Sequence, residues 1–319
     1  MRAAVLDGVV SRPRLLEFPV PAPLARELLV SVRASSVNGL DDALARGRLL
    51  AEKEHEFPVV LGHDFAGVVE RTGEQVTRYQ EGDEVYGFVT RPKLDARSGT
   101  WADYIVVPED RFVARKPSSL GFIESGALPL AGVTALIAVD TIDPKDGDRV
   151  LVVGATGGVG SYAVGLAAAR GAHVVATATP RDEARLRTLG AAEAIDYTTD
   201  DVAGAFQDGS GGRLAGLIDV VSDAKGFGEF AALLAPGGRA VTTLGVANGA
   251  QPGVSGVEMS NIYASPDPEL LTRVADAADA GGLRAWIQNV YPLEGAADAL
   301  DEFAAGAHGK ISLLLLNGQ

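Results

Sequence analysis

The pattern of hydrophobic and polar positions changes near residue 121 of this 319-residue chain. Before that point, short runs such as residues 28–34 (LLVSVRA) alternate between apolar and polar side chains, which predicts strands. Residues 66–71 and 100–108 show a similar pattern, and glycine and proline separate the runs. The first third of the chain is therefore predicted to form a compact, β-rich domain.

After residue 121, apolar β-branched runs alternate with helical patterns. Arg149–Val153 (RVLVV) is a continuous run of the kind that is buried in a parallel sheet. Further strands are predicted at His173–Ala178 and at residues 194–197, 216–221 and 239–244. Helices are predicted at residues 128–141, from the glycine turn to about 170, and at 181–189, 227–234 and 269–280. Strands that alternate with helices predict an α/β fold with a doubly wound parallel sheet.

The most informative motif lies in residues 150–160 (VLVVGATGGVG), where a buried strand runs through a glycine-rich turn into a helix. Gly157, Gly158 and Gly160 allow a tight turn and let the backbone approach a pyrophosphate closely. The helix N-terminus then offers unpaired N–H groups and the positive end of its dipole. The motif predicts a dinucleotide site, although Ala155 stands where the strict pattern has glycine. A glycine turn that holds no ligand is the alternative.

The end of the following strand indicates which dinucleotide is bound. NAD enzymes need an acidic residue there for the ribose 2′-hydroxyl, and this chain has Ala178. Thr177, Thr179 and Arg181 surround that position with hydroxyl groups and a guanidinium, which suit a 2′-phosphate. The cofactor is therefore predicted to be NADP(H). The alternative is that Arg181 only belongs to the start of a helix, where two acidic residues follow and offset its charge.

Composition narrows the choice of partners. The chain has 28 Lys and Arg against 42 Asp and Glu, a net charge of −14, which disfavours nucleic acids and anionic membranes. It contains no cysteine, which excludes disulfides, zinc–thiolate sites and cysteine nucleophiles. Its apolar runs are far shorter than the ~20 residues that span a bilayer, and its start lacks a signal-peptide pattern. We expect a cytoplasmic protein that acts on a small-molecule substrate.

Five segments spread along the chain match the motifs of one family. Residues 37–41 (VNGLD) resemble a V-N-P-x-D segment with Gly39 in place of proline, and residues 58–69 (PVVLGHDFAGVV) resemble P-x-x-x-G-x-D-x-x-G-x-V. Residues 82–87 (GDEVYG), 234–245 and 309–311 match further motifs. On these segments the chain resembles the zinc-free quinone oxidoreductases of the medium-chain dehydrogenase/reductase superfamily. Short-chain dehydrogenases share the glycine turn, but they use Tyr-x-x-x-Lys, which none of the seven tyrosines here forms.

The resemblance implies a fold of two domains. Residues 1–121 and 264–319 are expected to form a β-rich, GroES-like catalytic domain. Residues 122–263 are expected to form a Rossmann domain, whose doubly wound parallel sheet binds NADP(H). The resemblance further implies a homodimer, which pairs through a strand within residues 256–264.

The resemblance also bears on metal binding. Zinc-dependent members hold the catalytic metal with a cysteine, the histidine of a G-H-E segment, and a further cysteine or acid. This chain keeps His63, but Asn38 lies in the segment where the first cysteine belongs, and residues 91–99 form a short loop in place of the structural zinc lobe. We expect no zinc and interpret His63 as a hydrogen-bonding residue. A metal bound by oxygen and nitrogen ligands is the alternative.

The resemblance assigns roles to three groups of residues. The expected pyrophosphate cradle is Ala155, Thr156, Gly157, Gly158, Val159 and Gly160, and the expected 2′-phosphate and adenosine site is Thr177, Thr179, Arg181 and Tyr197. Gly245 and Lys310 complete the cofactor site, and the expected catalytic residues are Asn38, Asp41 and Thr134. Structural alternatives stay open for four of them: a helix cap for Asn38, a helix residue for Thr134, a surface aromatic for Tyr197 and a solvated turn lysine for Lys310.

These expectations lead to an NADPH-dependent oxidoreductase that transfers hydride to a quinone or an α,β-unsaturated carbonyl without a metal. In both acceptors a carbonyl stabilises the charge that develops after hydride addition. The alternatives are an enoyl-thioester reductase of a biosynthetic pathway and a non-catalytic NADPH-binding protein. The proton donor stays open among His55, Tyr86, Tyr104 and solvent.

Overall fold

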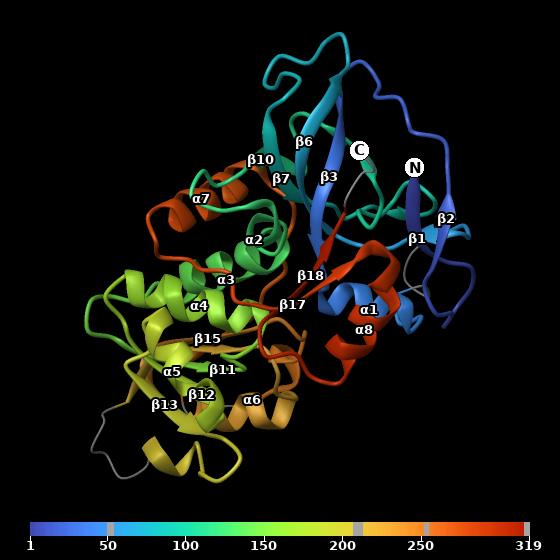
Figure 1. The fold of residues 1–319 in the computed structure, drawn as a ribbon. Helices are drawn as coiled ribbons and strands as arrows, with labels where there is room; N and C mark the ends of the chain where they lie inside the picture. Colours follow the sequence, from blue (N-terminus) through green and yellow to red (C-terminus); the bar gives the residue numbers. More distant parts are fainter. Residues whose placement is uncertain (50–53, 207–212, 252–254, 316–319) are drawn as a thin grey trace. The chain divides into compact units, whose positions relative to one another are not determined.

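The computed structural model describes residues 1–49, 54–206, 213–251 and 255–315 (Figure 1). The chain divides into two compact units. Unit 1 comprises Met1–Ala131, Ser265–Asp279 and Ala285–Gln319, and unit 2 comprises Gly132–Ala264 and Ala280–Arg284. Unit 1 thus extends past the boundary predicted at residue 121, and unit 2 includes a short return segment that the sequence did not indicate.

Unit 1 is built on a sheet that has the long strand β3 (Glu27–Ser36) at its centre. The strand order is β10 (Val113–Arg115), β7 (Glu84–Phe88), β6 (Asp64–Thr72), β3, β18 (Lys310–Leu314) and β17 (Ile287–Pro292), and β9 (Tyr104–Pro108) also pairs with β3. Smaller sheets join β2 (Arg14–Glu17), β1 (Arg2–Leu6) and β5 (Val59–Val60), and β4 (Glu54–His55) with β8 (Lys93–Leu94). The helices are α1 (Gly39–Ala45), α2 (Phe122–Gly126), α7 (Pro268–Asp279) and α8 (Ala296–Ala304), with the 3-10 turn η3 (Leu293–Gly295).

The strand predicted at residues 28–34 is confirmed, and it is buried on both faces. Leu28, Val30 and Val32 pack into the unit 1 core, and Leu29 and Ser31 on the opposite face are buried as well. The reason is tertiary, because β3 pairs with β6, β9 and β18 and also packs against α2. Alternation along one strand cannot report what covers its second face.

The end of the chain returns to the middle of this sheet. β18 lies antiparallel to β3, with Ser312 opposite Ser36, and the two strands run side by side in Figure 1. The backbone N–H of Val37 donates to the carbonyl of Ile311 at 2.9 Å. The return places Lys310, the first residue of β18, beside the residues that follow β3.

Unit 2 contains the predicted doubly wound parallel sheet. The strand order is β13 (Glu193–Asp196), β12 (His173–Ala178), β11 (Arg149–Val153), β14 (Leu214–Asp219), β15 (Leu234–Thr242) and β16 (Glu258–Asn261), and all neighbours are parallel. The helices are α3 (Pro129–Ile142), which begins in unit 1, α4 (Gly158–Ala169), α5 (Pro180–Leu189) and α6 (Ala224–Ala231), with the 3-10 turns η1 (Gly204–Phe206) and η2 (Ala247–Gly249). The strand order reverses between β11 and β14, and ligands bind at such a reversal, beside the carboxyl ends of the strands.

One helix differs from its prediction. The helix predicted at residues 227–234 spans Ala224–Ala231, because the Asp223 side chain accepts a hydrogen bond from the N–H of Gly226 (2.9 Å) and caps an earlier start. Leu234 instead pairs with Leu214 in the sheet. Within the described ranges, no helix is long and apolar enough to cross a membrane.

Candidate active site

Five polar side chains meet in the interior of unit 1, where β3 ends and β6 and β18 begin. They are Asn38, Asp41, His63, Asp64 and Lys310, and none has more than 7% of its surface exposed. Asn38 and Asp41 lie at the start of α1, His63 and Asp64 at the start of β6, and Lys310 at the start of β18. We call this group the unit 1 network. It brings two predicted catalytic residues together with the lysine predicted for the cofactor.

Asp64 is the centre of the unit 1 network, although sequence reasoning did not select it. Its Oδ2 accepts hydrogen bonds from Ser36 Oγ (2.6 Å) and Asn38 Nδ2 (2.8 Å), and its Oδ1 accepts from the N–H of Leu130 (2.8 Å). Lys310 Nζ lies 3.6 Å from the same Oδ2. A buried carboxylate needs such a set of partners, because an isolated charge is strongly disfavoured in the interior.

The ammonium of Lys310 is bound entirely within unit 1. Its Nζ donates to Asn38 Oδ1 (2.7 Å) and to the carbonyl of Val37 (3.1 Å), and it pairs with Asp64. Burial lowers the pKa of Lys310, whereas the charges of Asp64 and Asp41 oppose that shift. The alternative of a solvated turn lysine is therefore wrong, since the side chain is sealed. Contact between Lys310 and a cofactor stays a prediction.

Asn38 occupies the N-cap position of α1, but its side chain serves the unit 1 network. The amide oxygen accepts from Lys310 and the amide nitrogen donates to Asp64, which together fix the orientation of the amide. Nδ2 carries two hydrogens, so one donor remains that no described residue uses. The capping role falls to Asp41, whose Oδ2 accepts from the N–H of Asn38 at 2.8 Å.

His63 forms the second half of the unit 1 network with Asp41. The distance between His63 Nδ1 and Asp41 Oδ1 is 2.6 Å, and Asp41 is fully buried. The interpretation of His63 as a hydrogen-bonding residue is confirmed. The backbone of His63 is held as well, because its carbonyl accepts from the N–H of Val89 at 2.9 Å.

The side chains around His63 do not fit a zinc ion. Nδ1 of His63 is used by Asp41, and Asp64 is bonded to Ser36, Asn38 and Lys310. A divalent cation there would also face the ammonium of Lys310. Among the residues that the structure describes, no group of three or more His, Cys, Asp or Glu could hold a metal ion. No chemical step through a metal is derived for this site.

The proton-donor candidates from the sequence lie outside the unit 1 network. Tyr86 is fully buried and donates its hydroxyl hydrogen to the carbonyl of Leu271, and burial raises its pKa. This arrangement makes Tyr86 a structural residue. Tyr104 is partly buried on β9, and His55 is exposed on β4, where its ring meets the edge of Phe57 at 5.3 Å between centroids.

The glycine turn of unit 2 leaves open space at the start of α4. A Cβ added at Gly160 would lie 2.2 Å from the carbonyl oxygen of Gly154, so α4 can approach the turn only with glycine there. A Cβ at Gly157, the N-cap of α4, would meet only that oxygen at 3.6 Å and otherwise faces open space. The first amides of α4 have no partner within the helix. The Ala155 side chain is fully buried, which leaves its backbone as the group that a ligand could contact.

Two of the four residues predicted around a 2′-phosphate form hydrogen bonds to other residues of unit 2. Thr177 Oγ1 accepts from the N–H of Gly154 at 3.1 Å, which ties β12 to the glycine turn. Thr179 Oγ1 donates to Asp182 Oδ2 at 2.9 Å. Arg181, by contrast, is exposed at the start of α5 and forms no ion pair with a described residue, and Tyr197, after β13, is 51% exposed.

Arg185 supports the glycine turn, and sequence reasoning missed it. Its Nη2 donates to the carbonyl of Thr156 at 2.8 Å, and its Nη1 lies 3.6 Å from Asp182 Oδ1. Burial lowers the pKa of Arg185, and Asp182 opposes that shift. Arg185 lies one helical turn after Arg181, and this spacing of four residues is the only sequence signal that it carries.

Thr134 and Gly245 are the residues that the sequence predicts near the nicotinamide. Asp219 lies on β14, beside the reversal of strand order. Thr134 is 8% exposed in α3, and Gly245 follows β15 with a φ of 74°. Asp219 ends β14 opposite Val153, and its Oδ1 accepts from the N–H groups of Val221 (3.0 Å) and Ser222 (2.9 Å). Its Oδ2 is buried without a donor among the described residues. An unfilled acceptor at this position fits a ligand hydroxyl or amide.

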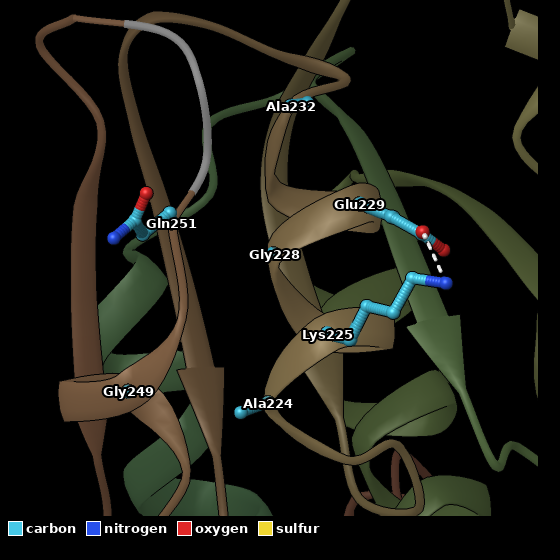
Figure 2. A pocket seen from close by; sticks show the side chains of 7 residues that line it. All are labelled: Ala224, Lys225, Gly228, Glu229, Ala232, Gly249 and Gln251. Carbon is cyan, nitrogen blue, oxygen red and sulfur yellow. Dashed lines mark ion pairs between the residues drawn. The ribbon is translucent and has the colours of Figure 1, made fainter.

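Two surface hollows lie apart from these groups. The first, of about 520 Å³, lies against α6 and η2. Figure 2 shows the Lys225–Glu229 ion pair (3.7 Å) on α6 and Gln251 on a separate segment, away from that pair. The second, of about 750 Å³, lies in unit 1 and includes Arg91, Arg111 and Phe112. Neither hollow is lined by a residue that was predicted for the site.

Comparison with known proteins adds independent findings. The family model described as "Alcohol dehydrogenase GroES-like domain" matches residues 25–118, and that described as "Zinc-binding dehydrogenase" matches residues 189–312. The chain is 37% identical over 235 residues to a 2-methylene-furan-3-one reductase of Solanum lycopersicum, an alignment that covers 72% of this chain but only 58% of that protein.

Two other relatives align over nearly the whole chain. A chloroplast envelope quinone oxidoreductase homolog of Arabidopsis thaliana is 30% identical over 311 residues, which cover 93% of this chain and 92% of that protein. The solved structure of the quinone oxidoreductase from Coxiella burnetii has a TM-score of 0.87 at 26% identity and covers 99% of both chains. The match in fold therefore includes both units.

Proposed function

Because the chain belongs to the quinone oxidoreductase family of the medium-chain dehydrogenase/reductase superfamily, we propose that it transfers hydride from NADPH to a quinone or an α,β-unsaturated carbonyl. The family consists of oxidoreductases that use a nicotinamide cofactor. The relative from Solanum lycopersicum is named for a ketone that is conjugated to a carbon–carbon double bond, which supports an acceptor of this class.

The observation that carries the choice of NADPH is the end of β12. Ala178, the last residue of β12, is buried and offers no carboxylate to a ribose 2′-hydroxyl. Arg181, three residues later, is exposed and has no ion-pair partner among the described residues. A guanidinium in that position favours a 2′-phosphate. In the proposal, the pyrophosphate binds to the first backbone amides of α4 and to the glycine turn, which Arg185 holds through the carbonyl of Thr156. Arg181 and Tyr197 contact the 2′-phosphate and the adenosine.

The reaction that we propose needs no metal. Bound NADPH supplies the hydride, and the acceptor's own carbonyl takes up the charge that results. The side chains of the unit 1 network then have two tasks. The remaining N–H of Asn38 Nδ2 donates to that carbonyl oxygen, and Lys310, fixed on Asn38 and Asp64, orients the amide and supplies positive charge behind it.

The experiment follows NADPH oxidation at 340 nm with 1,4-naphthoquinone and, in parallel, with 2-methyl-2-cyclohexen-1-one. NADH is the cofactor control. We expect turnover with NADPH to exceed that with NADH, and the faster acceptor identifies the preferred chemistry. Faster turnover with NADH contradicts the assignment at Ala178 and Arg181. Tight NADPH binding without turnover of either acceptor favours the thioester reductase or the non-catalytic protein instead.

The proposal includes a homodimer that pairs through β16. This strand is the last in its sheet, so one of its edges has no neighbouring strand in the order of the described strands. Tyr263, just beyond it, is 71% exposed. Pairing two such edges would remove an open sheet edge from solvent. Light scattering after size-exclusion chromatography tests this, and a mass near 32.9 kDa would contradict it.

A further inference from the structure

The pair of His63 and Asp41 has a geometry that cofactor binding does not explain. The side chain of His63 is 8% exposed, and that of Asp41 is fully buried. The distance from His63 Nδ1 to Asp41 Oδ1 is 2.6 Å. A carboxylate accepts hydrogen bonds only, so Nδ1 must carry the hydrogen in this contact. The bond therefore fixes the tautomer and the ring orientation, and it leaves Nε2 as the nitrogen that can exchange a proton.

Asp41 is itself fixed from the other side. Its Oδ2 accepts from the N–H of Asn38 at 2.8 Å, and it lies in the first turn of α1, where the helix dipole favours a negative charge. The helix thus holds the carboxylate, and the carboxylate holds the imidazole. Neither the side chain of Asp41 nor Nδ1 of His63 can turn toward another partner without breaking a buried hydrogen bond.

The backbone before His63 is equally constrained. Gly62 has a φ of 97°, and a Cβ there would lie 2.2 Å from Trp101 Cδ1 and 2.5 Å from Thr100 Oγ1. The indole of Trp101 is buried and donates through Nε1 to the carbonyl of Ser36 at 3.3 Å. This packing constrains the backbone before His63, while the hydrogen bond to Asp41 holds the ring.

His63 is bonded into a buried network that holds three charged groups. They are Asp41 from α1, Asp64 from β6 and Lys310 from β18. Asp41 contacts the ring itself, and Lys310 pairs with Asp64.

We infer that His63 relays the proton of the reaction: Nε2 takes a proton from solvent and donates it to the reduced acceptor, with Asp41 as the positioning residue of the ring. The inference rests on the proposed function. Hydride adds to the β-carbon of the enone, the π electrons move to form an enolate, and the Nε2–H bond breaks as its proton joins the α-carbon. The ring is left neutral with Nδ1–H still bound to Asp41, and water restores the Nε2 proton.

The structure also weighs against two of the other donors that the sequence left open, Tyr86 and His55. The hydroxyl of Tyr86 is sealed and already committed to the carbonyl of Leu271. His55 lies on the exposed strand β4. His63 is the imidazole that shares a hydrogen-bonded network with Asn38, the residue assigned to the substrate carbonyl.

The test compares His63→Gln with the wild type on two acceptors. Protonation of 2-methyl-2-cyclohexen-1-one at its α-carbon creates a stereocentre, whereas the oxygens of reduced 1,4-naphthoquinone exchange protons freely with water. We expect His63→Gln to lower kcat for the enone by about 10²–10⁴-fold and to yield both enantiomers of 2-methylcyclohexanone. The quinone rate should fall by a smaller factor than the enone rate, and the NADPH affinity, from fluorescence titration, should change less than about tenfold. His173→Gln, at the surface of unit 2, is the matched control.

The outcomes separate the inference from the proposed function. A wild type that reduces neither acceptor contradicts both. A His63→Gln variant that keeps the enone rate and produces a single enantiomer overturns the inference alone. If that variant does not fold, Asp41→Asn takes its place, since it keeps the imidazole but removes its orienting carboxylate. It is expected to lower kcat for the enone with little change in KM and to yield both enantiomers of the product, and an unchanged kcat with a single enantiomer overturns the inference.

Discussion

At the scale of single residues, the interior of unit 1 is organised around buried charge. Lys310, Asp64 and Asp41 are each at most 3% exposed, and every polar contact of the lysine goes to another member of the unit 1 network or to the carbonyl of Val37. Such a group is stable only while it is complete, because each member compensates another.

Lys310→Met tests this dependence. Removal of the ammonium leaves two buried carboxylates near each other, and we expect the free energy of unfolding to fall by about 3–5 kcal/mol. Urea denaturation followed by circular dichroism measures it. Lys225→Met is the matched control, since that side chain is 85% exposed and its one ion pair with a described residue is to Glu229. Equal stability of the two variants would contradict the account of the network.

Arg181→Ala tests the choice of cofactor. We expect the dissociation constant for NADPH to rise about tenfold, which is ~1.4 kcal/mol, and that for NADH to stay unchanged. The control is Arg187→Ala on the same helix, where the guanidinium pairs with Glu183 instead. Fluorescence titration with both nucleotides measures the effect, and a parallel loss of NADH affinity would argue against a 2′-phosphate contact.

At the scale of elements, short contacts between backbone segments decide the position of the site. The glycine turn is held on three sides: Gly160 lets α4 approach, Thr177 ties the turn to β12, and Arg185 ties it to α5. The turn is therefore part of a rigid sheet-and-helix frame rather than a separate loop, which is what binding of a pyrophosphate by oriented amides requires.

Two alanine substitutions separate packing from binding in this turn. Gly160→Ala places a Cβ against the carbonyl of Gly154, and we expect a loss of about 1–3 kcal/mol in the free energy of unfolding. Gly157→Ala has room and a φ of −79°, so stability should hold or rise by up to about 1 kcal/mol while NADPH affinity falls. Urea denaturation and fluorescence titration measure the two effects. A Gly157→Ala variant with full affinity would place the pyrophosphate elsewhere.

The segment before α2 is held by the carboxylate of Asp279, the last residue of α7. Asp279 accepts hydrogen bonds from the N–H and hydroxyl groups of Ser118 and Ser119, at 2.7–3.1 Å. These bonds, led by that from the Ser119 hydroxyl, hold the pKa of Asp279 well below its usual range. The folded-state pKa lies below the unfolded one, so the stabilisation is present above the unfolded value of about 4 and is lost as pH falls through the folded value.

Asp279→Asn is therefore expected to lower the free energy of unfolding by about 1 kcal/mol at pH 7, with a difference from the wild type that shrinks below about pH 4. Urea denaturation across that range measures it. Asp276→Asn, an exposed position of the same helix, is the control. A difference that stays constant into acid would mean that the charge of Asp279 contributes nothing.

At the scale of the whole molecule, the chain carries fourteen more negative than positive charges, and an anionic cofactor must bind against this repulsion. We expect local features to overcome it: the helix amides at the glycine turn and the exposed guanidinium of Arg181. The long-range repulsion is screened by salt, whereas contacts at the site are screened less.

NADPH should accordingly protect the folded chain. At a concentration of 100 times its dissociation constant, a ligand that binds only the folded state adds about 2.7 kcal/mol to the free energy of unfolding. A thermal-shift titration with NADPH, with NADH alongside, measures it. No rise in the midpoint with NADPH, or a larger rise with NADH, would contradict the cofactor assignment.

The sequence by itself determined the order of elements in unit 2 and the position of the glycine turn between β11 and α4. Arg149–Val153 and His173–Ala178 were located to the residue, because a buried parallel strand and the turn after it are encoded by neighbouring residues. The end of α6 could not be located in this way, since Leu234 joins a strand through pairing with Leu214.

Only the tertiary structure decided how the site residues relate to one another. Nothing local to Lys310 reveals that β18 returns beside β3 and seals its ammonium against Asn38. In the same way, only the structure shows that Thr177 bonds to Gly154, while its contact with a 2′-phosphate stays a prediction. His63 acquires a defined tautomer only because α1 presents Asp41 to it. The hydrophobic pattern depends on residues that are near one another in the sequence. Buried charged groups are held by residues that are distant in the sequence and meet only in the folded chain.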